Sequence, residues 1–209
     1  MGSILLSTAY FPPVSCFALI KNADKILIEK EENYIKQTYR NRCRILTANG
    51  PEYLTVPVLS ASFRKTPVKD VRIDYSKRWQ QIHIRAFTSA YRSSAFFEFF
   101  FDPVEKLINS KETFLLDFNM KSLETVLKAL KLAIPAYFTE AFQSVTGRAD
   151  DFRYSISPKK ETPGFFSPRE YFQVFSNKFG FVPDLSILDL IFNAGPDSAE
   201  YLEVNRIRQ

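Results

Sequence analysis

The chain has 209 residues, and its 28 lysines and arginines against 23 aspartates and glutamates give a net charge of +5. With 45% hydrophobic and 24% charged residues, the composition is that of a globular protein and excludes a disordered, collagen-like or coiled-coil chain. A single domain over residues 1–209 is expected at this length. The chain is rich in aromatic residues, with 21 phenylalanines and 10 tyrosines, but has one histidine.

The two cysteines and the apolar runs bear on the compartment. Cys16 and Cys43 stand apart in the sequence, and with one histidine in the chain they do not predict a zinc site; we expect two small buried hydrophobes. No secretory signal and no membrane-spanning apolar run of about 18 residues is recognised. A reducing, cytoplasmic location is therefore expected.

The first 75 residues are predicted to be rich in β-structure. Residues 4–10, 17–20 and 25–28 are short apolar runs separated by proline, asparagine and aspartate, which is the pattern of strands joined by turns. The clearest element is a hairpin in which Asn49 and Gly50 join residues 43–48 to residues 52–58, because Asn-Gly readily adopts the positive φ angles of a tight turn. A last strand is expected over residues 71–75.

From residue 76 onward the apolar period becomes helical. A first helix, capped by Ser76, is predicted from one apolar stripe: Trp79, Ile82, His83, Ala86, Phe87, Ala90 and Tyr91. Further helices are expected from Asp102 to about residue 109, over residues 123–134, from Ser167 to Gly180, and from Ser186 to Gly195, and residues 117–119 are expected to be a connection. The fold class is therefore α+β, with a β-rich part over residues 1–75 and a mostly helical part over residues 76–209 packed on it.

The sharpest electrostatic feature lies between residues 36 and 44. In an extended strand Lys36, Arg40, Arg42 and Arg44 share one face, because side chains alternate. Guanidinium groups match the paired oxygens of phosphate or carboxylate, and Asn41 can add neutral hydrogen bonds. Binding of an anion and a solvated strand face both stay open at this point.

His83 is the single imidazole and so the simplest candidate for acid/base catalysis near neutral pH. If it is functional, Trp79 and Tyr91 should lie beside it on the same helix face. Its place in an apolar stripe is equally compatible with a buried structural histidine.

Other features favour ordinary structural roles. Arg78, Arg85 and Arg92 recur every seven residues along one helix face, which permits nucleic-acid binding but is more typical of solvated arginines. Residues 96–101 are an aromatic run expected to form core. No Walker loop, G-x-G-x-x-G, G-x-S-x-G or H-E-x-x-H motif occurs, so no cofactor and no metal site is predicted, and the common nucleotide-hydrolysing, dinucleotide-dependent and serine-hydrolase classes are disfavoured.

Several segments together resemble the WbqC-like family of bacterial proteins. They are residues 10–13 (Tyr-Phe-Pro-Pro), 33–36 with 40–42, 54–58, the Trp79-to-His83 spacing followed by Tyr91, and 185–192. The resemblance implies an intracellular bacterial protein associated with the biosynthesis of surface polysaccharides such as O-antigen, and implies no established reaction. The family's recurrent positions fall on Tyr10, Pro12, Lys36, Asn41, Arg42, Pro57, Trp79, His83 and Tyr91. Many relatives carry His-Gln-Pro where this chain has residues 7–9 (Ser-Thr-Ala). If that histidine is a base in relatives, His83 is the remaining candidate here.

Two functions follow as hypotheses. The first is a transferase acting on a nucleotide- or lipid-linked sugar, adding an acyl or aminoacyl group. Lys36, Arg40 and Arg42 would hold a phosphate or carboxylate and Asn41 would orient it.

The remaining site residues would come from the aromatic set. His83 would accept the proton, Trp79 would stack on a sugar or base, and Tyr10 and Tyr91 would line the site. The alternative function is a non-catalytic binding or scaffold protein recognising a phosphorylated ligand, a nucleic acid or a partner enzyme. A small anionic molecule is the expected partner in the first case, nucleic acid is disfavoured, and the oligomeric state is not predicted.

Overall fold

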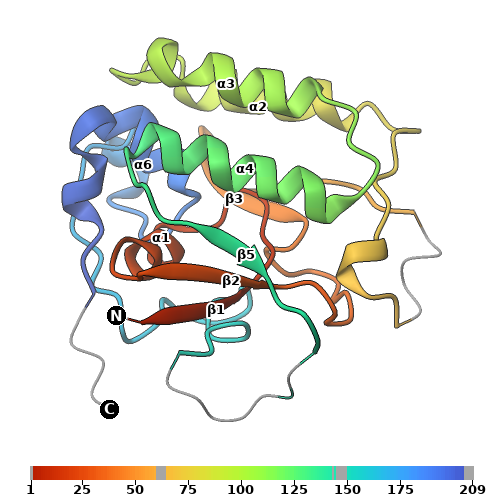
Figure 1. The fold of residues 1–209 in the computed structure, drawn as a ribbon. Helices are drawn as coiled ribbons and strands as arrows, with labels where there is room; N and C mark the ends of the chain where they lie inside the picture. The colour runs from red at the N-terminus through yellow and green to blue at the C-terminus, as the bar shows by residue number, and fades with distance from the viewer. Residues whose placement is uncertain (1, 60–64, 143, 145–149, 205–209) are drawn as a thin grey trace.

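The computed structural model describes residues 2–59, 65–142, 144 and 150–204. A small parallel sheet forms one side of the molecule, and helices are stacked over it in layers (Figure 1). The predicted α+β class is confirmed: strands lie mostly in the N-terminal half and helices mostly in the C-terminal half.

The sheet of the described residues has the strand order β1-β2-β5 and is parallel throughout. Its strands are β1 (Ser3–Ser7), β2 (Lys25–Glu29) and β5 (Ala136–Phe138). Parallel neighbours need a crossover connection, which between β1 and β2 is helix α1 (Val14–Lys21). All three strands therefore end at the same edge of the sheet.

The strand predicted over residues 17–20 is wrong, because this segment lies inside α1. Residues 14–20 are all buried, so the helix shows no polar face and little amphipathic period. A short, fully apolar run is compatible with either a buried strand or a buried helix, and pattern alone cannot separate them.

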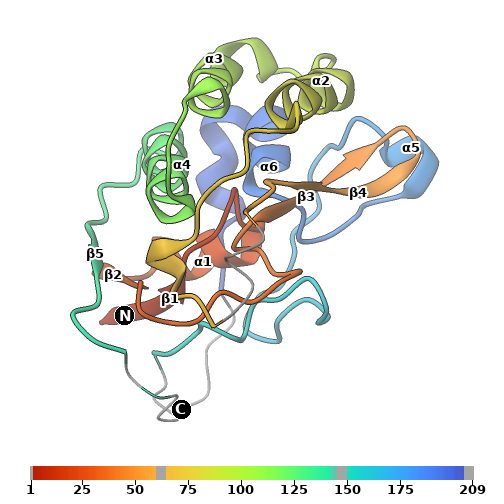
Figure 2. The same cartoon turned by 90° about the vertical axis from the view of Figure 1, so that its right-hand side faces the viewer.

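The predicted hairpin is confirmed. Strands β3 (Arg42–Thr47) and β4 (Gly50–Thr55) pair antiparallel, with Thr47 opposite Gly50 at the turn. Gly50 has a φ of 110°, which favours glycine. The hairpin projects from the body, and its tip meets α5 (Ser176–Phe179), where Lys178 donates to the carbonyl of Ala48 over 2.8 Å (Figure 2).

The strand expected over residues 71–75 is not formed as such. Two isolated bridges join this segment to the rest of the chain, between Val58 and Ile73 and between Arg72 and Phe114. The segment instead leads into the helical layers.

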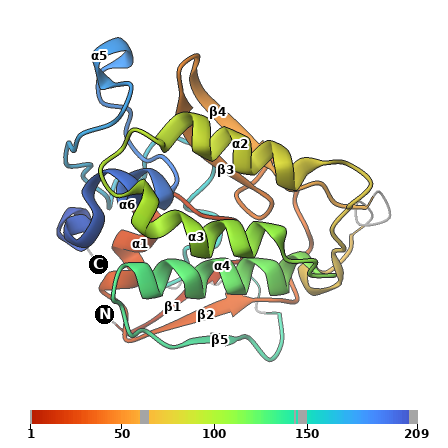
Figure 3. The same ribbon diagram turned by 90° about the horizontal axis from the view of Figure 1, so that it is seen from above.

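The upper layers are made by α2 (Trp79–Tyr91), α3 (Phe97–Asn109) and α4 (Leu115–Ala129), with α3 and α4 side by side (Figure 3). The helix predicted over the Trp79-to-Tyr91 stripe is confirmed, although Arg78 rather than Ser76 is its N-cap residue. Helix α4 begins at Leu115, so residues 117–119 are helical and not a connection.

The two predicted capping boxes, at Asp102 and at Ser167, do not mark the first residue of a helix. Helix α3 begins at Phe97 and holds Pro103 in its interior, so the aromatic run is part of the helix and Asp102 does not cap it. Proline has no N–H, so the hydrogen bond that residue 103 would donate to the carbonyl of Phe99 is missing from α3. Between Ser167 and Gly180 the helical part is α5 alone.

Helix α6 (Ile187–Ala194) agrees with the prediction at both ends. The Ser186 hydroxyl accepts a hydrogen bond from the backbone N–H of Leu188, as an N-cap residue should. Gly195 follows with a φ of 56°, and the ring of Phe96 lies where a side chain at this position would begin. The chain then forms a 3-10 helix over Gly195–Tyr201.

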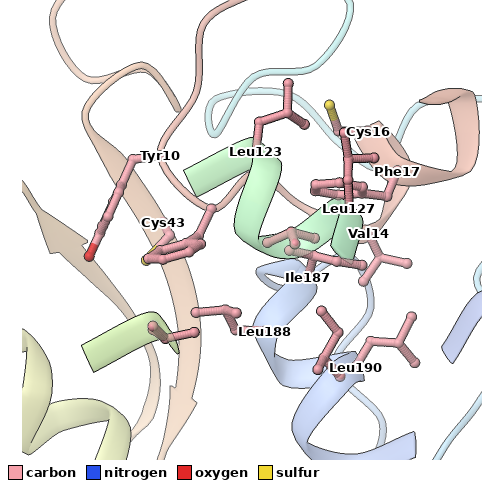
Figure 4. Packing of buried hydrophobic residues seen from close by; sticks show 14 of the residues in the cluster. Tyr10, Val14, Cys16, Phe17, Cys43, Leu123, Leu127, Ile187, Leu188 and Leu190 are labelled. Carbon is pink, nitrogen blue, oxygen red and sulfur yellow. The ribbon is translucent and has the colours of Figure 1, made fainter. Parts of the chain in front are cut away.

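The core joins the sheet layer to the helices. Val14 and Phe17 of α1, Leu127 of α4 and Ile187 of α6 lie together in it (Figure 4). Cys16 and Cys43 are free and buried, as expected, and burial raises the pKa of the Cys16 thiol to about 12. No helix within the described ranges is long and apolar enough to cross a membrane.

Candidate functional site

A cavity of about 250 Å³ opens at the carboxyl end of β1. Three chain segments line it: the end of β1 with the following connection and Cys16, residues 35–40 after β2, and residues 152–160. In Figure 2 the last of these is the cyan segment below the hairpin. In proteins with an open parallel sheet, ligands bind just beyond the carboxyl ends of the strands. We therefore take this cavity as the candidate site and call it the pocket.

The connection between β1 and α1 is held in a strained conformation. Phe11 is buried and has a φ of 40°, which is rare for a residue with a side chain. Its N–H donates to the hydroxyl of Ser122, and its carbonyl accepts from the hydroxyl of Ser186, so α4 and α6 both fix it. Backbone strain of this kind is concentrated at functional sites.

Five cationic side chains line the pocket. Arg40 and Arg153 are buried, whereas Lys36, Lys159 and Lys160 are exposed at its mouth. Four serine and threonine side chains lie among them: Ser7, Thr8, Thr38 and Ser157.

Arg40 is bound within the protein. Its Nε and Nη2 donate to the two carboxylate oxygens of Glu32 over 3.0 and 2.6 Å. Nη1 donates to the hydroxyl of Thr38, and Nη2 also donates to the hydroxyl of Ser7 over 2.9 Å. Arg40 therefore organises the pocket wall more than it offers a free fork to a ligand.

Arg153 forms the second buried ion pair. Its Nε and Nη2 donate to the carboxylate of Asp151 over 2.9 and 2.6 Å, which raises the pKa of the arginine, and Nη1 donates to Glu29 at the end of β2 over 3.2 Å. The hydroxyl of Ser7 donates to the carbonyl of Arg153, and this joins the two arginines through one serine.

The charges divide between the floor and the mouth of the pocket. The two arginines of the floor are paired with three carboxylates that do not themselves line the pocket, Glu29, Glu32 and Asp151, which gives 2 − 3 = −1. The three lysines at the mouth supply the positive charge that an anion would meet first. The N-terminus of α1 does not add to it, because Ser15 N–H and hydroxyl both donate to the carboxylate of Asp184.

His83 lies elsewhere, in a buried aromatic cluster. Its Nε2 is 3.2 Å from the carbonyl of Thr55 and must be the donor there, so Nδ1 accepts from the hydroxyl of Tyr10 over 2.9 Å. Trp79 lies beside it, with ring centroids 5.1 Å apart. Burial lowers the pKa of His83 to about 4. A catalytic role for His83 stays a prediction, and these contacts favour the alternative of a structural histidine.

The other predicted site residues are also placed by these contacts. Tyr91 is buried, and its hydroxyl accepts from the N–H of Leu46. Asn41 is buried and donates to the carbonyl of Val56. Arg42 lies over the ring of Tyr53, with Cζ 5.5 Å from the ring centroid.

The structure thus brings the predicted residues together in two places. Of the eight predicted site residues, Lys36 and Arg40 line the pocket. Tyr10, Trp79 and His83 instead contact one another in the aromatic cluster. The places are linked through the chain, since Tyr10 follows the pocket residue Ala9 and its N–H donates to the carbonyl of Tyr39. Arg153, Lys159 and Lys160 were missed, because no local pattern joins them to residues more than a hundred positions earlier.

The other candidate features give weaker evidence for a functional site. Arg78, Arg85 and Arg92 are exposed along α2, and the last two border a surface hollow, which fits solvated arginines. Within the ranges that the structure describes, no group of three or more His, Cys, Asp or Glu side chains is placed to hold a metal ion.

Residues 8–170 match the sequence profile of the WbqC-like protein family. The chain is 24% identical to the uncharacterized protein Rv1507c of Mycobacterium tuberculosis, over 97% of both chains. No solved structure shows significant similarity to it.

Proposed function

Because the chain belongs to the WbqC-like protein family, we propose that it is a transferase of bacterial surface-polysaccharide biosynthesis that acts on a nucleotide- or lipid-linked sugar. The proposed reaction moves an acyl or aminoacyl group onto that sugar, and the proposed location is the cytoplasm. Two buried free thiols fit a reducing compartment.

The observation that carries the proposal is the gathering of Lys36, Lys159 and Lys160 at the mouth of the pocket. Ammonium groups hold phosphate or carboxylate as point charges, and a pocket with partly apolar walls strengthens that attraction by reducing contact with water. The two buried arginine–carboxylate pairs keep the floor rigid, so that the lysines are presented from a fixed frame.

His83 acts in this proposal as a positioning residue. It holds the Tyr10 hydroxyl, and Tyr10 in turn is part of the connection that lines the pocket. A direct role as proton acceptor would require Tyr10 to leave Nδ1, the ring nitrogen that carries the lone pair.

The test compares two double variants that remove the same charge. Lys159→Ser/Lys160→Ser should weaken binding of a nucleotide sugar, measured by calorimetry, by about tenfold or more, since two phosphate contacts are lost. Arg85→Ser/Arg92→Ser removes two exposed cations from α2 and should leave the affinity unchanged. Equal weakening in both would mean general charge attraction and contradict a pocket site.

A second candidate function is supported by the pocket lining itself. Among its described residues there is no carboxylate and no imidazole, and the pKa values of Cys16 and Tyr39 are raised by burial. These groups are poor bases at neutral pH, which favours a binding protein without chemistry of its own. Saturable binding of nucleotide sugars without turnover, across a panel of acetyl and aminoacyl donors, would support this candidate over the transferase.

A further inference from the structure

Tyr154 gives the pocket a feature that a simple anion does not need. It lines the pocket and is 37% exposed. Ile35, which is 42% exposed, and Ile156 add apolar surface beside the lysines. The lining thus combines an aromatic ring, aliphatic walls and cations, which suits a molecule that has both a flat apolar part and an anionic part.

The Tyr154 ring is held from within the protein. The guanidinium carbons of Arg40 and Arg153 lie 6.0 and 5.8 Å from its centroid. Both arginines are buried and paired with carboxylates. Lys160 donates to the carbonyl of Tyr154 over 2.7 Å and places its ammonium group beside the same residue.

The exposed Tyr154 ring offers a flat π surface beside the lysines of the pocket. Every nucleobase has a flat π face that stacks on such a ring, and the lysines can hold the phosphates that a nucleotide carries and a neutral sugar lacks. The arrangement therefore favours a nucleotide over a neutral sugar at this position.

We propose that the pocket binds a nucleoside diphosphate, with the base stacked on Tyr154 and the phosphates held by Lys36, Lys159 and Lys160. This inference rests on the proposed function and narrows its substrate from activated sugars in general to nucleotide-linked sugars. Tyr154 then determines specificity by stacking on the base, a role for which the sequence suggested Trp79.

The experiment is calorimetric titration of the full chain with UDP, dTDP, CDP, GDP, ADP, inorganic diphosphate, ribose 5-phosphate and geranyl diphosphate. At least one nucleoside diphosphate should bind about tenfold or more tightly than inorganic diphosphate, within the range of one base–aromatic stack. Ribose 5-phosphate and geranyl diphosphate, which lack a base, should bind no more tightly than inorganic diphosphate.

Variants assign the effect to the ring. Tyr154→Leu should remove the preference for the base while leaving the affinity for inorganic diphosphate within about twofold, and Tyr154→Phe should keep the preference. Tyr137→Leu is the matched control, since Tyr137 is 55% exposed on β5 and does not line the pocket. Circular dichroism on each variant confirms folding, and the ligand series on the unmodified chain decides the question if Tyr154→Leu does not fold.

The outcomes separate this inference from the proposed function. Binding of inorganic diphosphate with no gain from any base, or a base preference that survives Tyr154→Leu, overturns the nucleoside assignment and leaves the anion site standing. Tighter binding of geranyl diphosphate overturns it in favour of a lipid-linked substrate. Failure of every probe to bind the folded protein overturns both.

Discussion

His83 is a buried residue whose titration should be visible in the stability of the whole protein. It is 2% exposed, and both ring nitrogens are hydrogen-bonded, so the His83 side chain is neutral in the folded protein at pH 7. Its pKa falls from the usual 6.5 to about 4 in the folded state. Between these values the unfolded chain binds the proton more tightly, and folding stability is lost as the pH falls.

The first prediction concerns His83→Gln, which keeps one donor and one acceptor in the same place. The wild-type free energy of unfolding, relative to that of the variant, should decrease by about 3 kcal/mol as the pH falls from 6.5 to 4. Urea denaturation at several pH values measures it. A difference that does not change with pH would show that folding leaves the pKa of His83 unchanged, and a difference that grows as the pH falls would show that a nearby anion raises it.

Asp189 should have the opposite effect on how the stability of the protein changes with pH. It is buried, and it accepts hydrogen bonds from Tyr171 over 2.6 Å and from Gln173 over 3.0 Å. Burial raises its pKa from 3.8 to about 6, so the folded state binds the proton more tightly and stability is lost as the pH rises through this range.

The second prediction is that Asp189→Asn, which can still accept both hydrogen bonds, raises the free energy of unfolding by about 3 kcal/mol at pH 7. At pH 4 the variant and the wild type should be equal, because the aspartate is then protonated. Denaturation at the two pH values is the measurement, and equal stability at pH 7 would contradict a raised pKa.

The third prediction tests the buried pair of Arg40 and Glu32. Arg40→Met leaves the Glu32 carboxylate buried without its partner and should destabilise the protein by about 3–5 kcal/mol. Replacing both residues, Arg40→Met with Glu32→Leu, should recover much of the loss, since apolar pairs of similar size are tolerated. A double-mutant cycle in urea measures the coupling, and additive losses would mean that the two side chains do not interact.

These residues show what sequence reasoning can and cannot reach. The cluster around Lys36 and Arg40 was visible because its members are close in the chain. That Arg40 serves Glu32 rather than a ligand was not visible, since burial and hydrogen-bond partners follow from the fold. Arg153 meets Glu29 from 124 positions away, and no local pattern could predict this contact.

At the scale of elements, periodicity predicted well where one face of an element is polar. Helix α2 has such a face, and the hairpin is set by its Asn-Gly turn. Helix α1 is buried around its circumference and was mistaken for a strand. In α3 the aromatic run before Pro103 looked like core without a definite structure, because a proline with an aspartate before it usually starts a helix.

The fourth prediction concerns this proline. Pro103 is exposed, interior to α3 and unable to donate to the carbonyl of Phe99. Pro103→Ala restores that hydrogen bond and should raise the free energy of unfolding by about 1–3 kcal/mol, since proline disfavours a helix interior by about 3 kcal/mol relative to alanine. Thermal denaturation tests it, and a lower melting temperature would show that α3 depends on a bend at this residue.

At the scale of the whole molecule, the net charge of +5 is not evenly spread. Three lysines stand at the mouth of the pocket, whereas three arginines lie along the outer face of α2. The α+β class and the family were accessible from the sequence, but the site was not, because it forms where residues 35–40 and 152–160 meet at the end of β1.

We propose above all that this pocket binds an anionic ligand. Hydrogen–deuterium exchange with and without UDP tests it directly, because a bound ligand slows exchange of the amides that it covers or orders. Protection should appear in residues 35–40 and 152–160, with α2 unchanged. Protection along α2 instead, or no protection at a ligand concentration that saturates binding, would contradict binding of the ligand in the pocket.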